Sequence, residues 1–374
     1  MLRLRSSCAA VAVSAAIAAG PALAGADVVL EWNIIALKTT AAAPFNPPLE
    51  TRNLAIVHAA MFDAVNAITR EFHPYAVNLQ APAWASPEAA AIAAAHATLL
   101  QLYPAQQSVL DSAYRASLGL ISDGPGKTSG IEMGQAVAVR ILTLRASDGA
   151  AAAVDAVYTP GDKPGDWNPT PPAFLPALDP GWGSVRPFVL RSASQFRPAP
   201  PPALNSGRYT RDFNEIKTIG STGSLNRSQD QTDLAQFWIS TAAQNWNPAA
   251  REIAVAQGLT LSQNARAFAL LNLAGADAFI AAWDAKFAYN QWRPVTAIRA
   301  ADADGNPATD ADPSWTPLLV TARFPDYIAD HVRRRSAESP RTSVRQAPGR
   351  SHHPHQHHSA RGGRKLHHLQ RHRR

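Results

Sequence analysis

The sequence predicts an all-α fold, in which helices form a bundle from about residue 50 to residue 299. Three observations support this prediction. Alanine is abundant, aromatic residues make up only 7% of the chain, and apolar residues recur with the period of a helix. A chain of 374 residues with 46% hydrophobic content can also bury a large core. We therefore expect closely packed helices, and a circular dichroism spectrum dominated by strand would contradict this expectation.

Residues 1–24 have the pattern of an export signal. Two arginines precede an apolar run at residues 9–19, and Ala22-Leu23-Ala24 is a small-x-small cleavage pattern. The run is too short to cross a bilayer comfortably, so we expect no transmembrane segment there. Cys8 is the only cysteine and lies within this signal, which excludes disulfides and zinc-thiolate sites from the exported chain. The predicted location is periplasmic or extracellular.

The predicted helices of the N-terminal half follow an apolar run at Val28 to Leu37 and a loop at Pro44 to Pro48. They cover Asn53 to Ile68, Pro87 to Leu102, Ala105 to Leu118 and Ile131 to Ser147, with a turn at Asp123-Gly124-Pro125-Gly126.

Three residues in these helices are of types that bind metals or transfer protons in other proteins. His58 and His96 lack a His or Glu partner three or four positions on, so we interpret them as structural histidines rather than metal ligands. Asp63 is interpreted as a cap or surface partner rather than a general base.

Residues 158–202 are rich in Pro, Gly and Trp. The prolines exclude a regular helix, while the tryptophans make this stretch too apolar for a disordered linker. We therefore expect an ordered, irregular Pro/Trp-rich loop that wraps the helices.

Helices are predicted to resume at Thr210 to Ile219, Ser228 to Thr241, Pro248 to Gln257 and Ser262 to Asn290. In the second of these we expect Leu234, Phe237 and Trp238 to face inward, and we expect the last to be the bundle centre. Residues 302–307 resemble the start of a calcium loop. They lack glycine at the sixth position and glutamate at the twelfth, which indicates an acidic turn instead.

Lys286 and Arg293 lie seven residues apart, which corresponds to two turns along one helix face, with Trp283 one turn before the lysine. Pro294 has no N–H and disfavours an α conformation at Arg293, so the helix is predicted to end there. A lysine charge beside a planar guanidinium suits a tetrahedral oxyanion. On spacing alone, however, a solvated basic face is the commoner explanation.

The residues in full resemble the vanadium-dependent haloperoxidases. That family shares its oxyanion pocket with the type 2 phosphatidic acid phosphatases and bacterial acid phosphatases. Its first motif is Lys-x6-Arg-Pro, which residues 286–294 match, and some members carry a tryptophan at the position of Trp283. The stretch that follows the motif in this chain is Phe324-Pro325-Asp326-Tyr327-Ile328-Ala329-Asp330-His331.

The second and third motifs of the family match less well. The second is Pro-Ser-Gly-His: His331 aligns with its histidine, but Ala329 and Asp330 replace the serine and glycine. The third, Ser-Arg-x5-His-x3-Asp, is missing.

The resemblance implies a helical bundle of the haloperoxidase/acid phosphatase type at residues 25–331, with its C-terminal part missing. It also implies a vanadate cofactor bound by Lys286 and Arg293, with His331 as the catalytic proton-transfer group. Trp283 would be a wall of the pocket, and a core-filling indole is the alternative.

The reaction and its substrates stay open. With vanadate the substrates would be hydrogen peroxide and a halide, and with phosphate the same pocket would hydrolyse a phosphoester. Without the third motif we expect the chain as written to be inactive, and a frameshift after His331 would explain the loss. The oligomeric state is also left open.

Residues 332–374 hold 12 Lys and Arg against one acid, Glu338, and so account for the net charge of +7. Such a segment buries too little apolar surface to offset its ordering entropy, and we expect a disordered Arg/His-rich tail. An exported helical protein with a basic, anion-binding tail is the non-enzymatic alternative. No specific nucleic-acid partner is expected, because aromatic residues are not interleaved. The histidines would bind Ni²⁺ or Zn²⁺ only adventitiously, so we expect no metal site.

Overall fold

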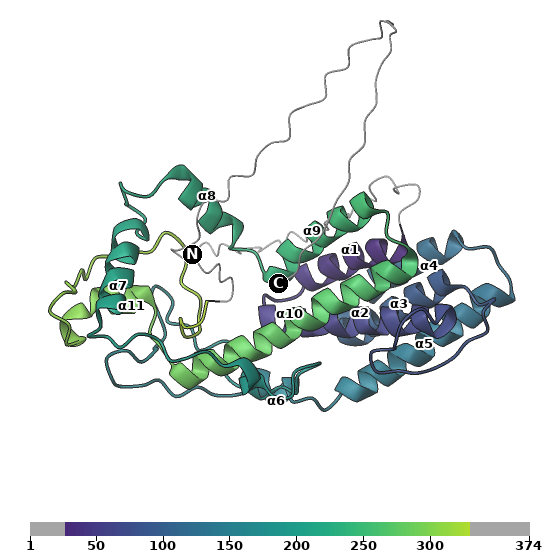
Figure 1. Ribbon diagram of the computed structural model, residues 1–374, viewed down its shortest axis with the longest axis horizontal. Helices are drawn as coiled ribbons and strands as arrows, with labels where there is room; N and C mark the ends of the chain where they lie inside the picture. The colour runs from purple at the N-terminus through teal and green to yellow at the C-terminus, as the bar shows by residue number, and fades with distance from the viewer. Residues whose placement is uncertain (1–26, 330–374) are drawn as a thin grey trace, which may run out of the picture. The chain divides into compact units, whose positions relative to one another are not determined.

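The computed structural model describes residues 27–329, and every regular element among them is a helix (Figure 1). The helices are α1 (Val28–Ala41), α2 (Pro47–Thr69), α3 (Pro87–Leu102), α4 (Gln107–Gly119), α5 (Pro125–Arg145), α6 (Ala150–Val154), α7 (Gly207–Ile219), α8 (Gln229–Phe237), α9 (Ala242–Gln257), α10 (Leu261–Tyr289) and α11 (Pro294–Arg299). The all-α prediction is confirmed. The expected export signal, His331 and the basic tail lie outside the described residues.

Several helices begin earlier than predicted because proline occupies their first turn. α2 begins at Pro47 instead of Asn53, and α5 begins at Pro125, inside the predicted turn. Proline is tolerated there because the first N–H groups of a helix have no partner within it. α9 also begins earlier, at Ala242, and continues through Pro248 with the loss of one backbone hydrogen bond.

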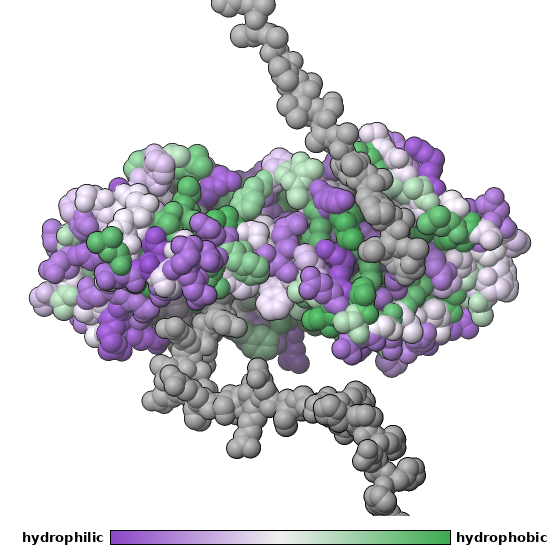
Figure 2. All heavy atoms as spheres, turned by 90° about the horizontal axis from the view of Figure 1, so that it is seen from above, coloured by the Kyte–Doolittle hydropathy of each residue, from purple (hydrophilic) through white to green (hydrophobic). Residues whose placement is uncertain are grey.

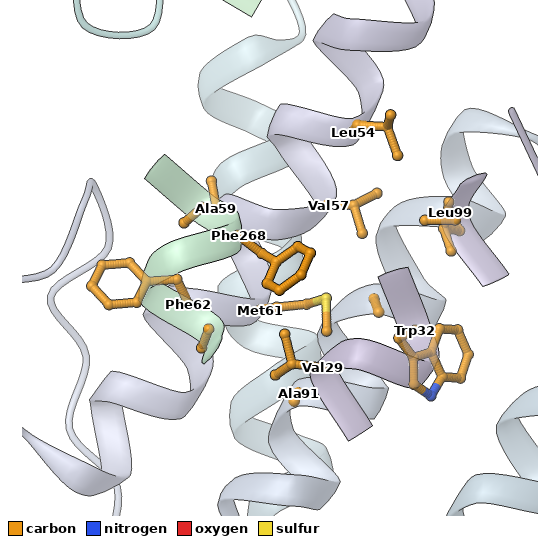
Figure 3. Close-up of a cluster of buried hydrophobic side chains, with 14 of the residues drawn as sticks. Val29, Trp32, Leu54, Val57, Ala59, Met61, Phe62, Ala91, Leu99 and Phe268 are labelled. Carbon is orange, nitrogen blue, oxygen red and sulfur yellow. The ribbon is translucent and has the colours of Figure 1, made fainter. Parts of the chain in front are cut away.

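The centre of the bundle is α2 and not, as predicted, α10. Residues 50–68 of α2 are buried on all sides, and α3, α5 and α10 pack along it. Figure 3 shows how these layers meet: Phe268 of α10 lies near Met61 of α2, while Val29 and Trp32 of α1 lie on another side. The alanines and methionine of α2 let four helices approach closely. α10 has both buried and exposed residues along its length.

Among the described residues, only α10 is long and apolar enough to cross a bilayer by composition. In its most apolar window 56% of the residues are buried against the rest of the fold, and a core helix passes the same test.

The expected inward orientation of Leu234 and Phe237 is wrong, since these α8 side chains are 52% and 56% exposed. Trp238 is half-buried. On α9, Trp246 and Ile253 are also exposed, and hydrophobic atoms lie scattered among polar ones on the face seen in Figure 2. Helical periodicity identifies residues that share a face, but it does not determine whether another element covers that face.

The irregular loop is ordered, as expected. Between α6 and α7 the chain forms only two short 3₁₀ turns, Trp182–Ser184 and Ala193–Phe196. Trp167 and Trp182 are fully buried. These indoles fix the loop against the helices.

Two buried aspartates each bind three successive backbone N–H groups. Asp63 on α2 accepts hydrogen bonds of 2.6 to 2.9 Å from residues 75–77. Asp277 on α10 accepts bonds of 2.6 to 2.8 Å from residues 188–190. Burial raises the pKa of Asp63, and the three N–H groups oppose this shift. Asp63 is therefore neither a helix cap nor a surface residue but a buried anchor for the loop after α2.

α3 and α5 touch through glycine. A Cβ atom on Gly134 of α5 would lie 2.3 Å from the carbonyl oxygen of Ala90 and 2.8 Å from Cβ of Ala93, both on α3. Gly130, one turn earlier on α5, is equally close to α3. Glycine therefore lets the two helix backbones approach more closely than any other residue would allow.

We predict that Gly134→Ala destabilises the protein by about 1–2 kcal/mol, because overpacking outweighs the better helix propensity of alanine. The matched control is Gly275→Ala within α10, where an added Cβ would have no atom within 4 Å. That variant should gain up to about 1 kcal/mol from propensity alone. Urea unfolding of both variants measures the difference, and equal stabilisation by the two would contradict the close contact.

Candidate functional site

Lys286 and Arg293 do not share a helix face, contrary to the prediction. α10 ends at Tyr289, because Asn290 adopts a left-handed conformation with φ of 51° and donates its N–H to the carbonyl of Lys286. Arg293 lies beyond that end, in an extended conformation before Pro294, and is the N-cap of α11. The side chains of both residues nevertheless bind the same segment, residues 324–328.

The side chain of Lys286 is buried, with 1% of the residue exposed. Its Nζ donates hydrogen bonds to the carbonyl oxygens of Pro325 at 3.2 Å, Asp326 at 3.3 Å and Ile328. An ammonium at this depth requires such partners, because burial without them would cost several kcal/mol. The lysine therefore fixes the path of the segment 324–328.

Arg293 binds the same segment from its other end. Its Nε donates to the carbonyl oxygen of Phe324 at 2.6 Å, and its Nη1 pairs with the carboxylate of Asp326 at 3.1 Å. Both cations also lie over the ring of Phe324, with Lys286 Nζ 4.9 Å and Arg293 Cζ 4.6 Å from its centroid. Two positive charges thus converge on one short stretch of backbone.

Trp283 lies beside this segment and is fully buried. Its Nε1 donates to the carbonyl oxygen of Leu178 at 3.1 Å, and its ring packs against Phe324 with centroids 4.8 Å apart. The indole is thus a packed core side chain that also lines the segment held by the two cations.

The donor set suits an oxyanion. The described residues contain no group of three or more His, Cys, Asp or Glu side chains that could hold a metal cation. An oxyanion instead requires N–H donors and positive charge in a place with little water, and Lys286 and Arg293 supply both. Asp326 is the one carboxylate paired with them in the described residues, and it neutralises part of the charge of Arg293.

Comparisons with known proteins found one matching family model and several similar haloperoxidases. Residues 266–341 match the family described as the VCPO second helical-bundle domain. Vanadium chloroperoxidase from Curvularia inaequalis is 27% identical over 388 aligned positions, which cover 81% of this chain and 63% of that protein. The protein in a crystal structure described as that of the first bacterial vanadium-dependent iodoperoxidase is 28% identical with a TM-score of 0.64, covering 82% of this chain and 75% of that chain.

These matches show that the chain is similar to vanadium-dependent haloperoxidases. Its fold is also that of a holo bacterial vanadium-dependent chloroperoxidase, which is 18% identical with a TM-score of 0.59, covering 78% of this chain and 76% of that chain. The chain spans 63% of the length of the Curvularia protein.

Sequence reasoning missed the loop residues that touch the segment 324–328. The N–H of Leu178 donates to the carbonyl oxygen of Arg323, and the carbonyl of Leu178 accepts from Trp283. Tyr327 donates its hydroxyl to the carbonyl oxygen of Ala199 at 2.8 Å. These contacts use backbone atoms that every residue has, so the sequence could not single them out. Only the unusual Pro/Trp content of the loop indicated that it contacts other parts of the fold. His331 lies just beyond the described residues.

Proposed function

We propose that this chain is an exported protein of the haloperoxidase type that holds vanadate at Lys286 and Arg293. With the third motif present, such a site would use hydrogen peroxide to oxidise a halide, and without it we expect little or no turnover. One observation carries the proposal: two cations from different elements converge on the segment 324–328, one of them a lysine that is 1% exposed. A solvated basic face would place such charges in water. The names of the similar proteins support peroxidase over phosphatase chemistry.

Each group in the site has a distinct task in this proposal. Bound vanadate would supply the chemistry that activates peroxide towards halide. Lys286 contributes a compact buried charge, and Arg293 orients the oxyanion through its planar fork. Trp283 and Phe324 exclude water with their rings, which strengthens the electrostatic attraction. His331 would transfer the proton, as the family resemblance implies.

The test is equilibrium binding of orthovanadate to the full chain by isothermal titration calorimetry. We expect Lys286→Met and Arg293→Gln each to weaken binding by about 10-fold to 100-fold, since a hydrogen bond to a charged group contributes about 1.5–3 kcal/mol. Circular dichroism must first show that the variants fold, because Lys286 is buried.

The matched control is Lys217→Met. Lys217 of α7 also donates to a carbonyl, that of Asp310 at 2.7 Å, but this bond is exposed and does not involve the segment 324–328. Its replacement should leave vanadate affinity unchanged. The oxyanion site is refuted if wild type binds neither vanadate nor phosphate, or if the Lys286 variant binds as tightly as the control. Assays with bromide and peroxide, and with a phosphoester, then separate the two chemistries.

A further inference from the structure

The irregular loop crosses the candidate site at two places. The first crossing is at Leu178, which bridges Trp283 of α10 and the carbonyl of Arg323 by hydrogen bonds of 3.1 and 2.8 Å. One loop residue therefore connects the helix that carries Lys286 with the start of the segment that Lys286 binds.

The second crossing is at residues 198–199 and uses two tyrosine hydroxyls. Tyr289, the last residue of α10, donates to the carbonyl oxygen of Pro198, and Tyr327 donates to that of Ala199. The two rings meet edge to face with centroids 5.7 Å apart. Here again the loop joins the end of α10 to the segment 324–328.

An ion pair fixes the second crossing to α10. Nε and Nη2 of Arg197 donate to the two carboxylate oxygens of Asp284, both at 2.7 Å. Asp284 lies two residues before Lys286. Gly183 of the same loop packs on this turn as well, because a Cβ there would lie 2.8 Å from Cα of Asp284.

We propose that Arg197 is a positioning residue for the oxyanion site. By clamping residues 198–199 to Asp284, it holds the hydroxyl of Tyr327 in place and keeps the carbonyls of the segment 324–328 facing Lys286. The link to oxyanion binding rests on the proposed function, whereas the link to the order of the segment does not.

The expected energy of the ion pair distinguishes a positioning role for Arg197 from a contribution to the global stability of the fold. The side chain of Arg197 is 38% exposed, and ion pairs at such positions add only about 0–1 kcal/mol to global stability. The paired, planar geometry instead adds orientation, which a lysine point charge does not reproduce. Loss of Arg197 is therefore expected to loosen one segment while leaving the unfolding midpoint nearly unchanged.

The first readout is hydrogen exchange measured by mass spectrometry in peptides covering residues 324–329. The N–H of Asp326 donates to the carbonyl of Gln291 at 2.9 Å and reports the order of the segment. We expect exchange about fivefold faster in Arg197→Ala, an intermediate rate in Arg197→Lys, and recovery in the swapped pair Arg197→Asp with Asp284→Arg. The control Arg208→Ala breaks an exposed pair with Asp212 on α7 and should change nothing in these peptides.

The second readout is vanadate affinity, which should fall about fivefold or more in Arg197→Ala and partly recover in Arg197→Lys. Unchanged exchange in Arg197→Ala overturns the inference whatever the protein binds. Faster exchange with unchanged vanadate affinity overturns the positioning role. Faster exchange in a protein whose wild type binds no vanadate supports the clamp on the segment and refutes the proposed function instead.

Discussion

Replacing Asp148 by alanine is expected to lower the free energy of unfolding by about 3–5 kcal/mol, since it removes the shared partner of two buried arginines. The carboxylate accepts from Nε of Arg52 at 2.8 Å and pairs with Nη2 of Arg145 at 2.8 Å. All three side chains are at most 11% exposed. Burial lowers the pKa of Arg145, and the Asp148 carboxylate opposes this shift.

The size of the effect follows from the charges that remain. Arg52 of α2 and Arg145 of α5 would face each other as two positive charges without a shared carboxylate, in a place with little water. Arg145 also donates to the carbonyls of Arg186 and Pro187, so its displacement would loosen the loop between α6 and α7.

Urea unfolding measures this loss against a matched aspartate. Asp123→Ala breaks an i,i+4 pair with Lys127 in which the aspartate is 96% exposed, and it should change stability by about 0–1 kcal/mol. Similar losses in the two variants would contradict the importance assigned to burial.

Acid is expected to destabilise the protein through His58, by roughly 3–5 kcal/mol between pH 6.5 and pH 3. The side chain is fully buried in α2, and burial, followed by the charge of Arg251, lowers its pKa from 6.5 to about 3. Below pH 6.5 the unfolded chain binds a proton that the folded protein cannot, so stability falls as the pH falls.

The hydrogen bonds around Asn33 explain why the folded protein does not accommodate a protonated His58. Arg251 can only donate, and it donates to Oδ1 of Asn33. The amide nitrogen of Asn33 must therefore face Nε2 of His58 at 2.9 Å and Oδ1 of Asn247 at 2.7 Å. Nε2 is then an acceptor, and a protonated ring would set donor against donor.

His58→Gln keeps an acceptor but does not titrate, so its stability should fall less steeply than that of wild type between pH 6.5 and pH 4. Urea unfolding at pH 7, 6, 5 and 4 measures the two slopes. His73→Gln, on an exposed histidine, is the control and should follow wild type. A His58→Gln variant with the wild-type slope would refute the assignment of a neutral, buried ring.

The sequence was most informative where residue type and spacing carry the chemistry. Lys286, Arg293 and Trp283 were singled out because their pattern resembles a family motif, and the structure brings their side chains together at the segment 324–328, while their role in anion binding stays a prediction. What these cations bind within the described chain was not predictable, since the carbonyl oxygens of the segment 324–328 look like any others. The predicted range Ser262 to Asn290 matches α10, but the argument from the motif wrongly carried the helix on to Arg293. Asn290 can adopt either a helical or a left-handed backbone conformation, so the sequence did not show that the helix ends just before it. Pro294 marked a helix boundary more clearly.

Packing partners were the other part that could not be predicted. The alanine-rich pattern predicted helices, and their positions are largely confirmed. It did not predict that Gly130 and Gly134 meet α3, or that Leu234 and Phe237 of α8 face solvent. These outcomes depend on segments far apart in the chain, and local periodicity carries no information about them.

The two aspartates that each bind three backbone N–H groups determine where the chain can accept inserted sequence. A peptide inserted within residues 75–77 or 188–190 would move N–H groups away from Asp63 or Asp277 and leave a buried carboxylate short of donors. The same peptide placed at an exposed loop position that bonds to no helix would lengthen only a connection between fixed points, at a small entropic cost. A tag or fused domain therefore belongs between such anchors and not at them.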